Sequence, residues 1–548
     1  MRTDFVRIYK SVHTWTGILS GMALFIAFYA GALSVFKEPL TRWATPPASL
    51  RVVPLDEAQS LILRTLKADP AAAKDFTVHL QDKEHVNARM QWQVRAPDAD
   101  DHDDAGTRYF GATLDGAGAA QVEEIRPSPL ATFIDVLHRV VGLPTDSDPN
   151  RWVMGVIATL YSVALVSGVV VLLPSLVKDF FALRVGKNLK RMWLDAHNVV
   201  GIVSLPFHVV MALSAVVFAF HDQIYVIQDK LVHGGQWRQA FQRPQGKPGA
   251  APARDPAAML TPLQLVQAAQ AVAPGFEPTM LQYQQVTGPR AVVRIWGKDA
   301  SAVSPRARGG FAAIDPYSGK VVNTDYLPGR QSTPNLFISS FFALHMASFG
   351  GEIVPWLYFL LGMAGAWLFY SGNLLWIETR RRRAAKQGPA APVQRLDTRL
   401  MACATVGVCL GSVCGISLTI AGAKWWQFTS VQDLTAWHQA LYYAAFFACL
   451  GWAFWRGAAR AVVPLLWAAV VLTLCIPLTS LLGWLAPATG LWAHTSAATL
   501  AVDATALVGA LGLAWMARAA ARRIAHGPAD SVWSAAPARE RAEQVAAA

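Results

Sequence analysis

Eight long stretches of this sequence are almost free of charged side chains, and each holds 18 residues or more. A stretch of this length can cross the hydrocarbon core of a bilayer as an α-helix. Because these stretches dominate the chain, we expect a mainly α-helical membrane protein with about eight transmembrane helices. The stretches are residues 11–36, 152–177, 196–221, 353–377, 401–423, 434–455, 461–485 and 492–517.

The distribution of charge supports a multi-pass membrane protein and predicts its orientation. Charged residues make up 15% of the chain, against about 25% in a typical soluble protein. The net charge of +12 comes mainly from short clusters beside the apolar stretches, such as residues 380–383, and not from a nucleic-acid-binding face. Lys and Arg accumulate in cytoplasmic loops. All clusters fall on one side if both termini are cytoplasmic, which predicts a bacterial inner-membrane protein.

Two long polar segments would then face the periplasm, and each is long enough for a small α+β domain. Amphipathic periodicity predicts a helix at residues 55–66 in the first segment and at residues 263–272 in the second. Alternating polar and apolar residues predict strands within residues 77–94, 280–296 and 311–322. In the last of these, an Asp-Pro-x-x-Gly sequence predicts a turn between two strands.

The chain therefore divides into membrane and periplasmic parts. The predicted order is a first transmembrane helix (1–36), a periplasmic domain (37–151), two helices joined by a basic cytoplasmic loop (152–221), a second periplasmic domain (222–352), a fourth helix (353–378), a basic cytoplasmic linker (379–399), a four-helix C-terminal membrane extension (400–518) and a cytoplasmic tail (519–548). Residues 242–256 are rich in Pro, Gly and Ala, which predicts a loop.

Histidines mark an internal repeat within residues 1–380. A His-x-x-x-Gly motif opens the first and third apolar stretches, at His13 and His197. A Leu-His pair precedes the second and fourth stretches, at His138 and His345. The order of span, periplasmic domain, Leu-His pair and span therefore occurs twice. This predicts a duplicated unit whose four helices form a pseudo-symmetric bundle.

The four histidines form two pairs according to their expected depth in the membrane. His13 and His197 are expected near the cytoplasmic face, and His138 and His345 near the periplasmic face. Two imidazoles from facing helices can bind both axial positions of a haem iron, and a helical bundle provides an apolar slot for the porphyrin. The sequence has no Cys-x-x-Cys-His motif for covalent attachment. Two haems at two depths could pass electrons across the bilayer.

Alternative readings of these histidines stay open. A histidine at a membrane boundary is often an interfacial or capping residue, so the repeat could be a helical scaffold with polar ends. His208 lies 11 residues after His197, which would place both on one helical face. It could replace His138 or His345 as a ligand, or bond to a neighbouring helix.

The C-terminal extension carries three further candidate residues. His438 and His494 lie at the periplasmic ends of two predicted spans, where they could bind a third haem or belong to an aromatic interfacial belt. Asp503 lies within the last apolar stretch. A carboxylate in the membrane is costly and is a candidate for a functional role in proton transfer or quinol chemistry.

The repeated motifs resemble the PepSY-associated transmembrane family. The resemblance covers about residues 5–385 and rests on the two His-x-x-x-Gly motifs, the two Leu-His pairs and Ala-Ile-Asp-Pro-Tyr-Ser-Gly-Lys at residues 313–320, which is similar to the end of a PepSY module. The family includes inner-membrane di-haem proteins that reduce ferric siderophores. The resemblance implies two PepSY-like periplasmic domains and two b-type haems. Their axial iron ligands would be His13, His197, His138 and His345.

The sequence thus suggests an oxidoreductase for iron uptake, which transfers electrons to a periplasmic ferric siderophore or other Fe(III) chelate. Neither a Gly-x-Gly-x-x-Gly fingerprint nor a P-loop is present, so the donor would be a cytoplasmic reductant or membrane quinol. One alternative is a haem-free membrane scaffold or regulator whose PepSY-like domains bind peptides or a protease. Another is a siderophore or iron permease. Only the first hypothesis requires a coloured protein.

Overall fold

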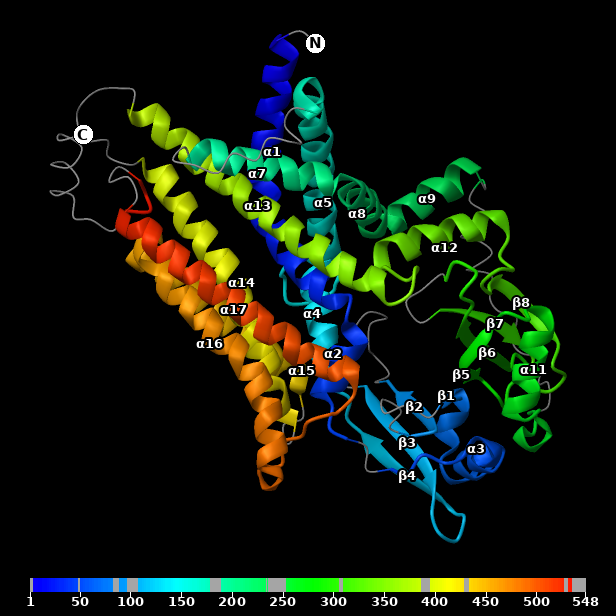
Figure 1. Cartoon of the computed structure of the whole chain (residues 1–548). Helices are drawn as coiled ribbons and strands as arrows, with labels where there is room; N and C mark the ends of the chain where they lie inside the picture. Colours follow the sequence, from blue (N-terminus) through cyan, green and yellow to red (C-terminus); the bar gives the residue numbers. More distant parts are fainter. Residues whose placement is uncertain are drawn as a thin grey trace. The chain divides into compact units, whose positions relative to one another are not determined.

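The chain folds into two compact units, each assembled from several segments. Unit 1 comprises Met1–Thr45, Ser128–Ala219 and Tyr358–Ala548, and unit 2 comprises Pro46–Pro127 and Phe220–Leu357. In the computed structural model the strands lie in unit 2 (Figure 1). The structure describes residues 3–47, 50–81, 88–95, 107–177, 189–232, 234, 253–304, 309–385, 395–427, 433–526 and 531–534.

Long apolar helices build unit 1. The first repeat supplies α1 (Thr3–Ser34), α2 (Lys37–Ala44), α4 (Leu130–Arg139), α5 (Asp148–Leu172) and the 3-10 turn η3 (Leu173–Ser175); the second supplies α7 (Leu189–Val203), α8 (Leu205–Ala219) and α13 (Ile353–Ala385). The C-terminal extension adds α14 (Leu396–Gln427), α15 (Leu434–Arg456), α16 (Ala458–Leu485), η5 (Pro487–Thr489) and α17 (Ala497–His526).

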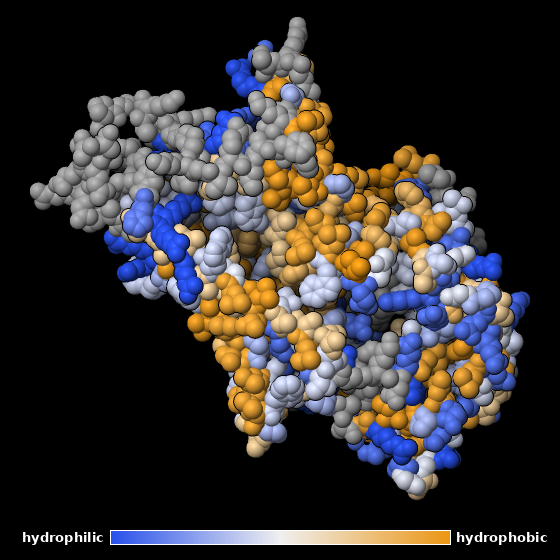
Figure 2. Space-filling model, viewed as in Figure 1, coloured by the Kyte–Doolittle hydropathy of each residue, from blue (hydrophilic) through white to orange (hydrophobic). Residues whose placement is uncertain are grey.

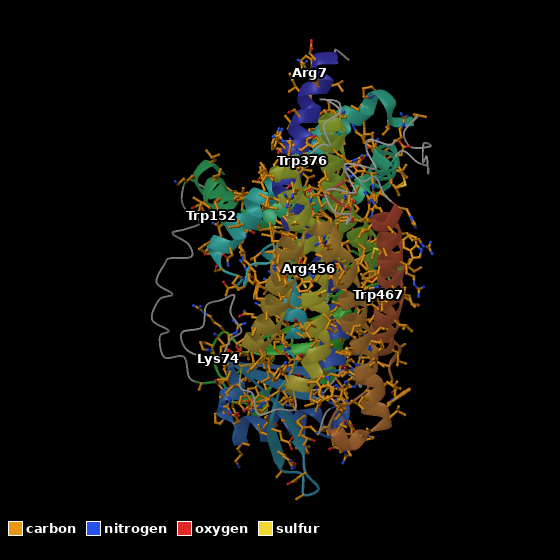
Figure 3. All side chains as sticks on the ribbon, turned by 90° about the vertical axis from the view of Figure 1, so that its left-hand side faces the viewer. Arg7, Lys74, Trp152, Trp376, Arg456 and Trp467 are labelled. Carbon is orange, nitrogen blue, oxygen red and sulfur yellow. The ribbon has the colours of Figure 1, made fainter. Side chains whose placement is uncertain are left out.

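Apolar side chains are exposed on the helices of unit 1. Hydrophobic surface lies along α16 (Figure 2), and the side chains of Trp152 and Trp467 are exposed (Figure 3).

Within the described residues, six helices are long and apolar enough to cross a membrane: α1, α5, α13, α14, α16 and α17. The bent pair of α7 and α8 makes a seventh if it forms one span. The chain is therefore a mainly helical, multi-pass membrane protein. The sixth expected span, residues 434–455, forms helix α15 but is not among the six helices above, because polar side chains such as His438 and Gln439 lower its mean hydropathy.

The third apolar stretch is not one straight helix. Helix α7 ends at Val203, α8 begins at Leu205, and the two helices are bent by 71° at this break. Pro206 accounts for the bend, because proline lacks an N–H donor and its ring clashes with the carbonyl group four residues earlier. The prediction that His197 and His208 share one helical face is therefore wrong.

Unit 2 is built on one eight-stranded sheet of order β4-β3-β2-β1-β5-β6-β7-β8, with antiparallel neighbours throughout (Figure 1). Its strands are β1 (Asp75–His79), β2 (Met90–Val94), β3 (Arg108–Leu114), β4 (Ala120–Ile125), β5 (Glu277–Gln284), β6 (Val292–Lys298), β7 (Gly310–Ile314) and β8 (Val321–Tyr326). Central strands β1 and β5 join the two repeats, with Thr77 opposite Gln282. The two segments expected to form separate domains therefore share one sheet.

Two amphipathic helices cover one face of this sheet. Helices α3 (Ala58–Ala68) and α11 (Pro262–Val272) bury Leu61 and Leu265 against alternate strand residues such as Phe76 and Tyr283. The unit also contains the short turns η1 (Leu55–Glu57), η2 (Pro70–Lys74) and η4 (Pro256–Ala258). The helices predicted at residues 55–66 and 263–272 are confirmed, since the apolar period in these segments reflects packing on a single face.

The predicted turn between β7 and β8 is also confirmed. The Asp315 carboxylate accepts hydrogen bonds from the backbone N–H groups of Tyr317 (2.8 Å) and Ser318 (3.0 Å), and Gly319 takes a positive φ of 72°. Glycine tolerates this backbone conformation best. Of the loop predicted at residues 242–256, residues 242–252 lie outside the described residues.

The remaining helices of unit 2 complete the repeat. Helix α9 (His221–Val232) follows α8, as α2 follows α1, and α12 (Thr333–Met346) precedes α13, as α4 precedes α5. Both halves therefore run from a span through a short helix, one sheet-covering helix, four strands and a His-bearing helix to the next span. This element order agrees with the internal repeat of the histidine motifs, and the pseudo-symmetric four-helix bundle stays a prediction.

Candidate functional site

The structure brings His13 of α1 and His197 of α7 together in unit 1. Their ring centroids are 6.4 Å apart, and the ring planes are inclined at 73°. A metal–nitrogen bond of about 2 Å on each side of one iron would place two imidazole centres roughly 6 Å apart. The two rings therefore have the separation that the axial ligands of a single haem iron require.

Hydrogen bonds to neighbouring helices fix the tautomer of both rings. The Nδ1 atom of His13 lies 2.8 Å from the carbonyl oxygen of Ala164, which only accepts, so Nδ1 is the protonated nitrogen. The Nδ1 atom of His197 lies 2.9 Å from the hydroxyl of Ser371, which itself donates to the carbonyl of Leu368. In both rings Nε2 keeps its lone pair. A hydrogen bond from the far ring nitrogen to a carbonyl or hydroxyl oxygen is typical of metal-binding histidines.

His138 makes the same kind of bond near the other end of α1. Its Nδ1 atom lies 2.8 Å from the carbonyl oxygen of Ala27. Ala27 follows His13 by 14 residues on the same helix, which corresponds to roughly 21 Å at 1.5 Å per residue. The two histidine sites of unit 1 are therefore separated by most of a membrane-spanning length.

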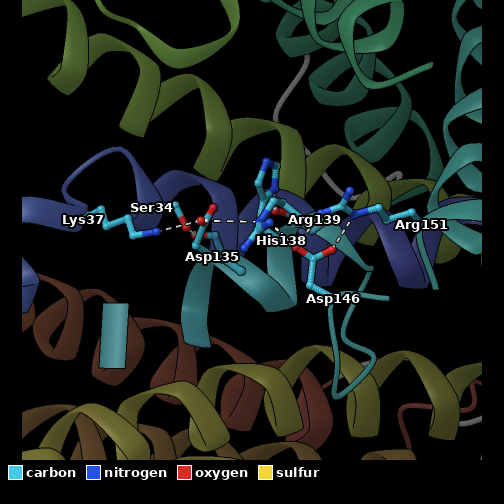
Figure 4. A network of polar contacts seen from close by, with 9 residues as sticks. Ser34, Lys37, Asp135, His138, Arg139, Asp146 and Arg151 are labelled. Carbon is cyan, nitrogen blue, oxygen red and sulfur yellow. Dashed lines mark hydrogen bonds and ion pairs between the residues drawn. The ribbon is translucent and has the colours of Figure 1, made fainter. Parts of the chain in front are cut away.

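An ion-pair network holds the helix that carries His138 (Figure 4). Lys37 of α2 donates to Asp135 of α4 at 2.9 Å, and Asp135 also pairs with Arg139 at 3.4 Å. Arg139 and Arg151 share the carboxylate of Asp146, whose side chain is only 3% exposed. The network ties α4 to α2 and to the start of α5, so it limits how far the imidazole can move.

We expect Asp135→Asn to weaken the fold at neutral pH by about 2 kcal/mol, the size of a hydrogen bond to a charged group. Burial alone would raise the pKa of Asp135, but Lys37 and Arg139 outweigh it and hold the pKa below its ordinary value. The stabilisation is therefore complete above the unfolded pKa of about 4 and is lost as the pH falls through the folded pKa. Apparent melting temperatures of both proteins between pH 7 and pH 3 test this. Exposed Asp222→Asn is the control, and a difference that did not shrink in acid would contradict the prediction.

Glycines close the Nδ1 side of these rings. A Cβ atom on Gly168 of α5 would lie 3.0 Å from Nδ1 and Cε1 of His13. A Cβ atom on Gly31 of α1 would lie 2.6 Å from Nδ1 of His138. Each glycine follows the carbonyl that binds the histidine by one helical turn. By contrast, a Cβ atom on Gly17 of the His-x-x-x-Gly motif would have nothing within 4 Å. The glycine in the sequence motif is therefore not one of the glycines that contact a histidine ring.

Adding one methyl group should destabilise the protein at Gly31 and Gly168 but not at Gly17. Gly31→Ala and Gly168→Ala are expected to displace an imidazole and to cost about 1–3 kcal/mol, as overpacking does. Gly17→Ala should be neutral or stabilise by up to about 1 kcal/mol, because alanine is the better helix former. Apparent melting temperature and bound haem per chain are the measurements. The same melting temperature and the same haem content in Gly31→Ala and Gly17→Ala would refute the packing argument.

His208 has a distinct environment in unit 1. The ring is 3% exposed, its Nδ1 atom lies 2.5 Å from the Tyr161 hydroxyl, and that hydroxyl donates to the carbonyl of His208. Its Nε2 atom is buried without a hydrogen-bond partner in the described structure, which is costly for a polar atom. The ring lies 5.5 Å from that of Phe28 on α1, the residue that follows Ala27 in the sequence.

His345 lies in the last turn of α12 and belongs to unit 2, whereas the other three predicted ligands belong to unit 1. The structure therefore brings together His13 and His197 as expected. The pairing of His138 with His345 stays a prediction.

The histidines of the extension have different surroundings. His438 is fully buried, its ring stacks 6.5 Å from Phe133, and neither of its nitrogens is bonded within the described residues. The Nε2 atom of His494 lies 2.8 Å from the carbonyl oxygen of Thr45. A third haem at these residues stays a prediction, and the Thr45 bond does not favour it.

Asp503 belongs to a buried polar cluster that the sequence did not indicate. Its carboxylate accepts hydrogen bonds from Trp43 (2.9 Å) and Ser480 (3.0 Å). The ammonium group of Lys424 donates to Ser480 (2.9 Å) and to the carbonyl of Trp492 (3.0 Å), and this lysine has no exposed surface. The cluster connects α2, α14, α16 and α17.

A haem suits the His13–His197 pair better than a bare metal ion does. No group of three or more His, Cys, Asp or Glu side chains that could hold an ion occurs among the described residues. A porphyrin provides four nitrogen ligands of its own, so two imidazoles complete its coordination. The ring separation and the fixed tautomers both fit such a group.

The sequence matches the family described as PepSY-associated TM region over residues 10–379. This match covers more than half of the chain and includes all four histidines of the repeat. The chain therefore belongs to this family of membrane proteins. No curated protein matches the chain.

Proposed function

We propose that this protein is a b-type di-haem electron-transfer protein of the bacterial inner membrane, which reduces a ferric siderophore or other Fe(III) chelate in the periplasm. The observation that carries the proposal is the His13–His197 pair, with ring centroids 6.4 Å apart and both Nδ1 atoms bonded to neighbouring helices. A bis-imidazole haem supplies reversible one-electron chemistry when it is bound. Membership of the family and His138, which bonds to α1 near the other end of that helix, support a second haem at another depth.

The protein would hold the two imidazole rings in position and fix their tautomer. The carbonyl of Ala164 and the hydroxyl of Ser371 keep the proton on Nδ1, so that Nε2 of His13 and His197 is the basic nitrogen. Hydrogen bonds to Nδ1 also increase the basicity of an imidazole ligand.

Two residues qualify as the partner of His138. His345 is its equivalent in the repeat, and we propose this pair as the second haem site. His208 is the second candidate, because its Nε2 atom is buried without a partner in the described structure and its ring lies beside Phe28 of α1. The variants His345→Ala and His208→Ala decide between them. The variant that lacks the true ligand should bind one haem per chain, and the other variant should still bind two.

The acceptor reaction needs only one electron for each iron. An Fe(III) chelate takes up the electron and becomes an Fe(II) chelate, which hard oxygen ligands hold more weakly. The iron is then released and the chelator is left intact, as iron uptake requires. The donor would be a cytoplasmic reductant or a membrane quinol.

The first experiment is a reduced-minus-oxidised absorption spectrum of the purified protein, with haem counted per chain by the pyridine haemochrome method. We expect a b-type spectrum and about two haems. The reduced protein is then mixed anaerobically with ferric citrate or a ferric trihydroxamate while Fe(II) is trapped by a coloured chelator. Reoxidation together with Fe(II) release supports the proposal. A colourless protein from haem-replete cells would refute it and favour a haem-free PepSY scaffold that binds peptides or a protease.

A further inference from the structure

Helix α12 of unit 2 has its small residues packed and its large apolar residues exposed. Ser339 and Ala343 are each 2% exposed, whereas Phe337 is 75% and Ile338 is 49% exposed. A helix on a water-soluble domain shows the opposite pattern, with the large apolar residues facing the core. Small residues at the packed face are typical of helices in membranes. In addition, α12 has no Asp, Glu, Lys or Arg.

Helix α9 of the same unit has a similar apolar stripe. Ile224, Ile227 and Leu231 follow one another at intervals of three and four residues, so they lie on one face of the helix. They are 39%, 56% and 80% exposed. A helix of 12 residues is only marginally stable in water without a packed apolar face. Its stability therefore calls for an apolar medium along this stripe.

The first repeat shows what happens to the equivalent residues when protein covers them. Counting back from the Leu-His pairs, Phe337 and Ile338 of α12 correspond to Leu130 and Ala131 of α4. These two residues are 0% and 1% exposed, because they belong to a cluster that includes Ile416 of the C-terminal extension. The chain has two copies of the repeat but only one C-terminal extension.

We propose that α9 and α12 lie in the headgroup region of the lipid bilayer, with their exposed apolar residues inserted among the acyl chains. Both helices are close in sequence to membrane-spanning candidates, since α9 begins two residues after the end of α8, the second half of the bent pair, and α12 is followed by α13. At the start of α13, Ile353 is also 79% exposed. Aromatic and aliphatic side chains on one face are typical of interfacial helices. Figure 2 shows hydrophobic surface over α9.

The test is site-directed spin labelling of the full chain in nanodiscs. A keto amino acid that reacts with a nitroxide reagent is placed at Phe337 or Ile227, which leaves the five native cysteines in place. Collision rates with oxygen, which partitions into lipid, and with a neutral nickel chelate, which stays in water, are measured for each label. Val508 of α17 (70% exposed) is the lipid reference, and Val322 of β8 (64% exposed) is the water reference.

We expect the oxygen-to-nickel ratio at Phe337 and Ile227 to exceed that at Val322 several-fold and to approach that at Val508. A ratio like that at Val322 would overturn the proposal. Low collision rates with both reagents would also overturn it, because protein would then cover the helices, either a second copy or another part of the chain. Ile224 and Ile338 provide second positions if a labelled protein is not monodisperse.

Discussion

Replacing His13 or His197 with alanine is expected to reduce bound haem from two groups per chain to one. Each side chain would supply one axial bond to the same iron, and the 6.4 Å separation of their rings leaves no room for two independent sites. The single variants and the double variant should therefore all contain one haem, since residues that act as a unit are not additive. A site that depended on one histidine would instead lose haem in only one of the two variants.

Haem content by pyridine haemochrome and a potentiometric titration are the measurements. Wild type should titrate with two components, and each variant should lose the same one. His221→Ala on α9 is the matched control, because this histidine is partly exposed and belongs to neither repeat motif. Its spectrum should be that of wild type. Two haems in either His13→Ala or His197→Ala would contradict the assignment.

Lys424→Met is expected to cost about 3–5 kcal/mol of stability, the loss typical of a broken buried charge pair. Lys424 has no exposed surface, and its ammonium group shares the Ser480 hydroxyl with the Asp503 carboxylate. Without the lysine, the carboxylate would stay in an apolar region with only the neutral donors Trp43 and Ser480. Asp503→Asn should have a similar cost, because the buried cation then keeps only the neutral acceptors Ser480 and Trp492.

The double variant separates charge pairing from loss of packing. Lys424→Met combined with Asp503→Asn should be more stable than the sum of the single changes, by about 0.5–3 kcal/mol. Denaturant unfolding in nanodiscs gives these free energies. Exposed Arg460→Met is the control and should change stability by no more than about 0.5 kcal/mol. Strict additivity would show that the two charges do not interact.

The sequence predicted most helices and hairpins because their apolar periods reflect local geometry. Residues 263–272 form a helix with one buried face, and the Asp315 turn joins two strands as expected. The break between α7 and α8 was also visible in principle, since Pro206 lies in the middle of an apolar stretch. A proline can be accommodated in a membrane helix, so its presence alone does not fix a bend of 71°.

The site was only partly predictable, because its supporting residues are defined by packing. The pairing of His13 with His197 followed from the repeat. Gly168 is 155 residues from His13 in sequence, and no local motif connects the two. Lys424 directly follows the apolar stretch of residues 401–423 in the sequence. Its hydrogen-bond partner Ser480 comes from another helix, 56 residues further along the chain.

The central pairing of β1 with β5 has a consequence for how the protein is made. Gln284 bonds to Asp75 across 209 residues, and α5, α7 and α8 lie between the two strands in sequence. At roughly 5–20 residues per second, a ribosome needs about 10–40 s to reach the second strand. During this time the edge of β1 has no neighbour from the second repeat, and unpaired edges invite aggregation. The first four strands of this protein are therefore the part of the sheet most exposed to mispairing until the last four strands have been made.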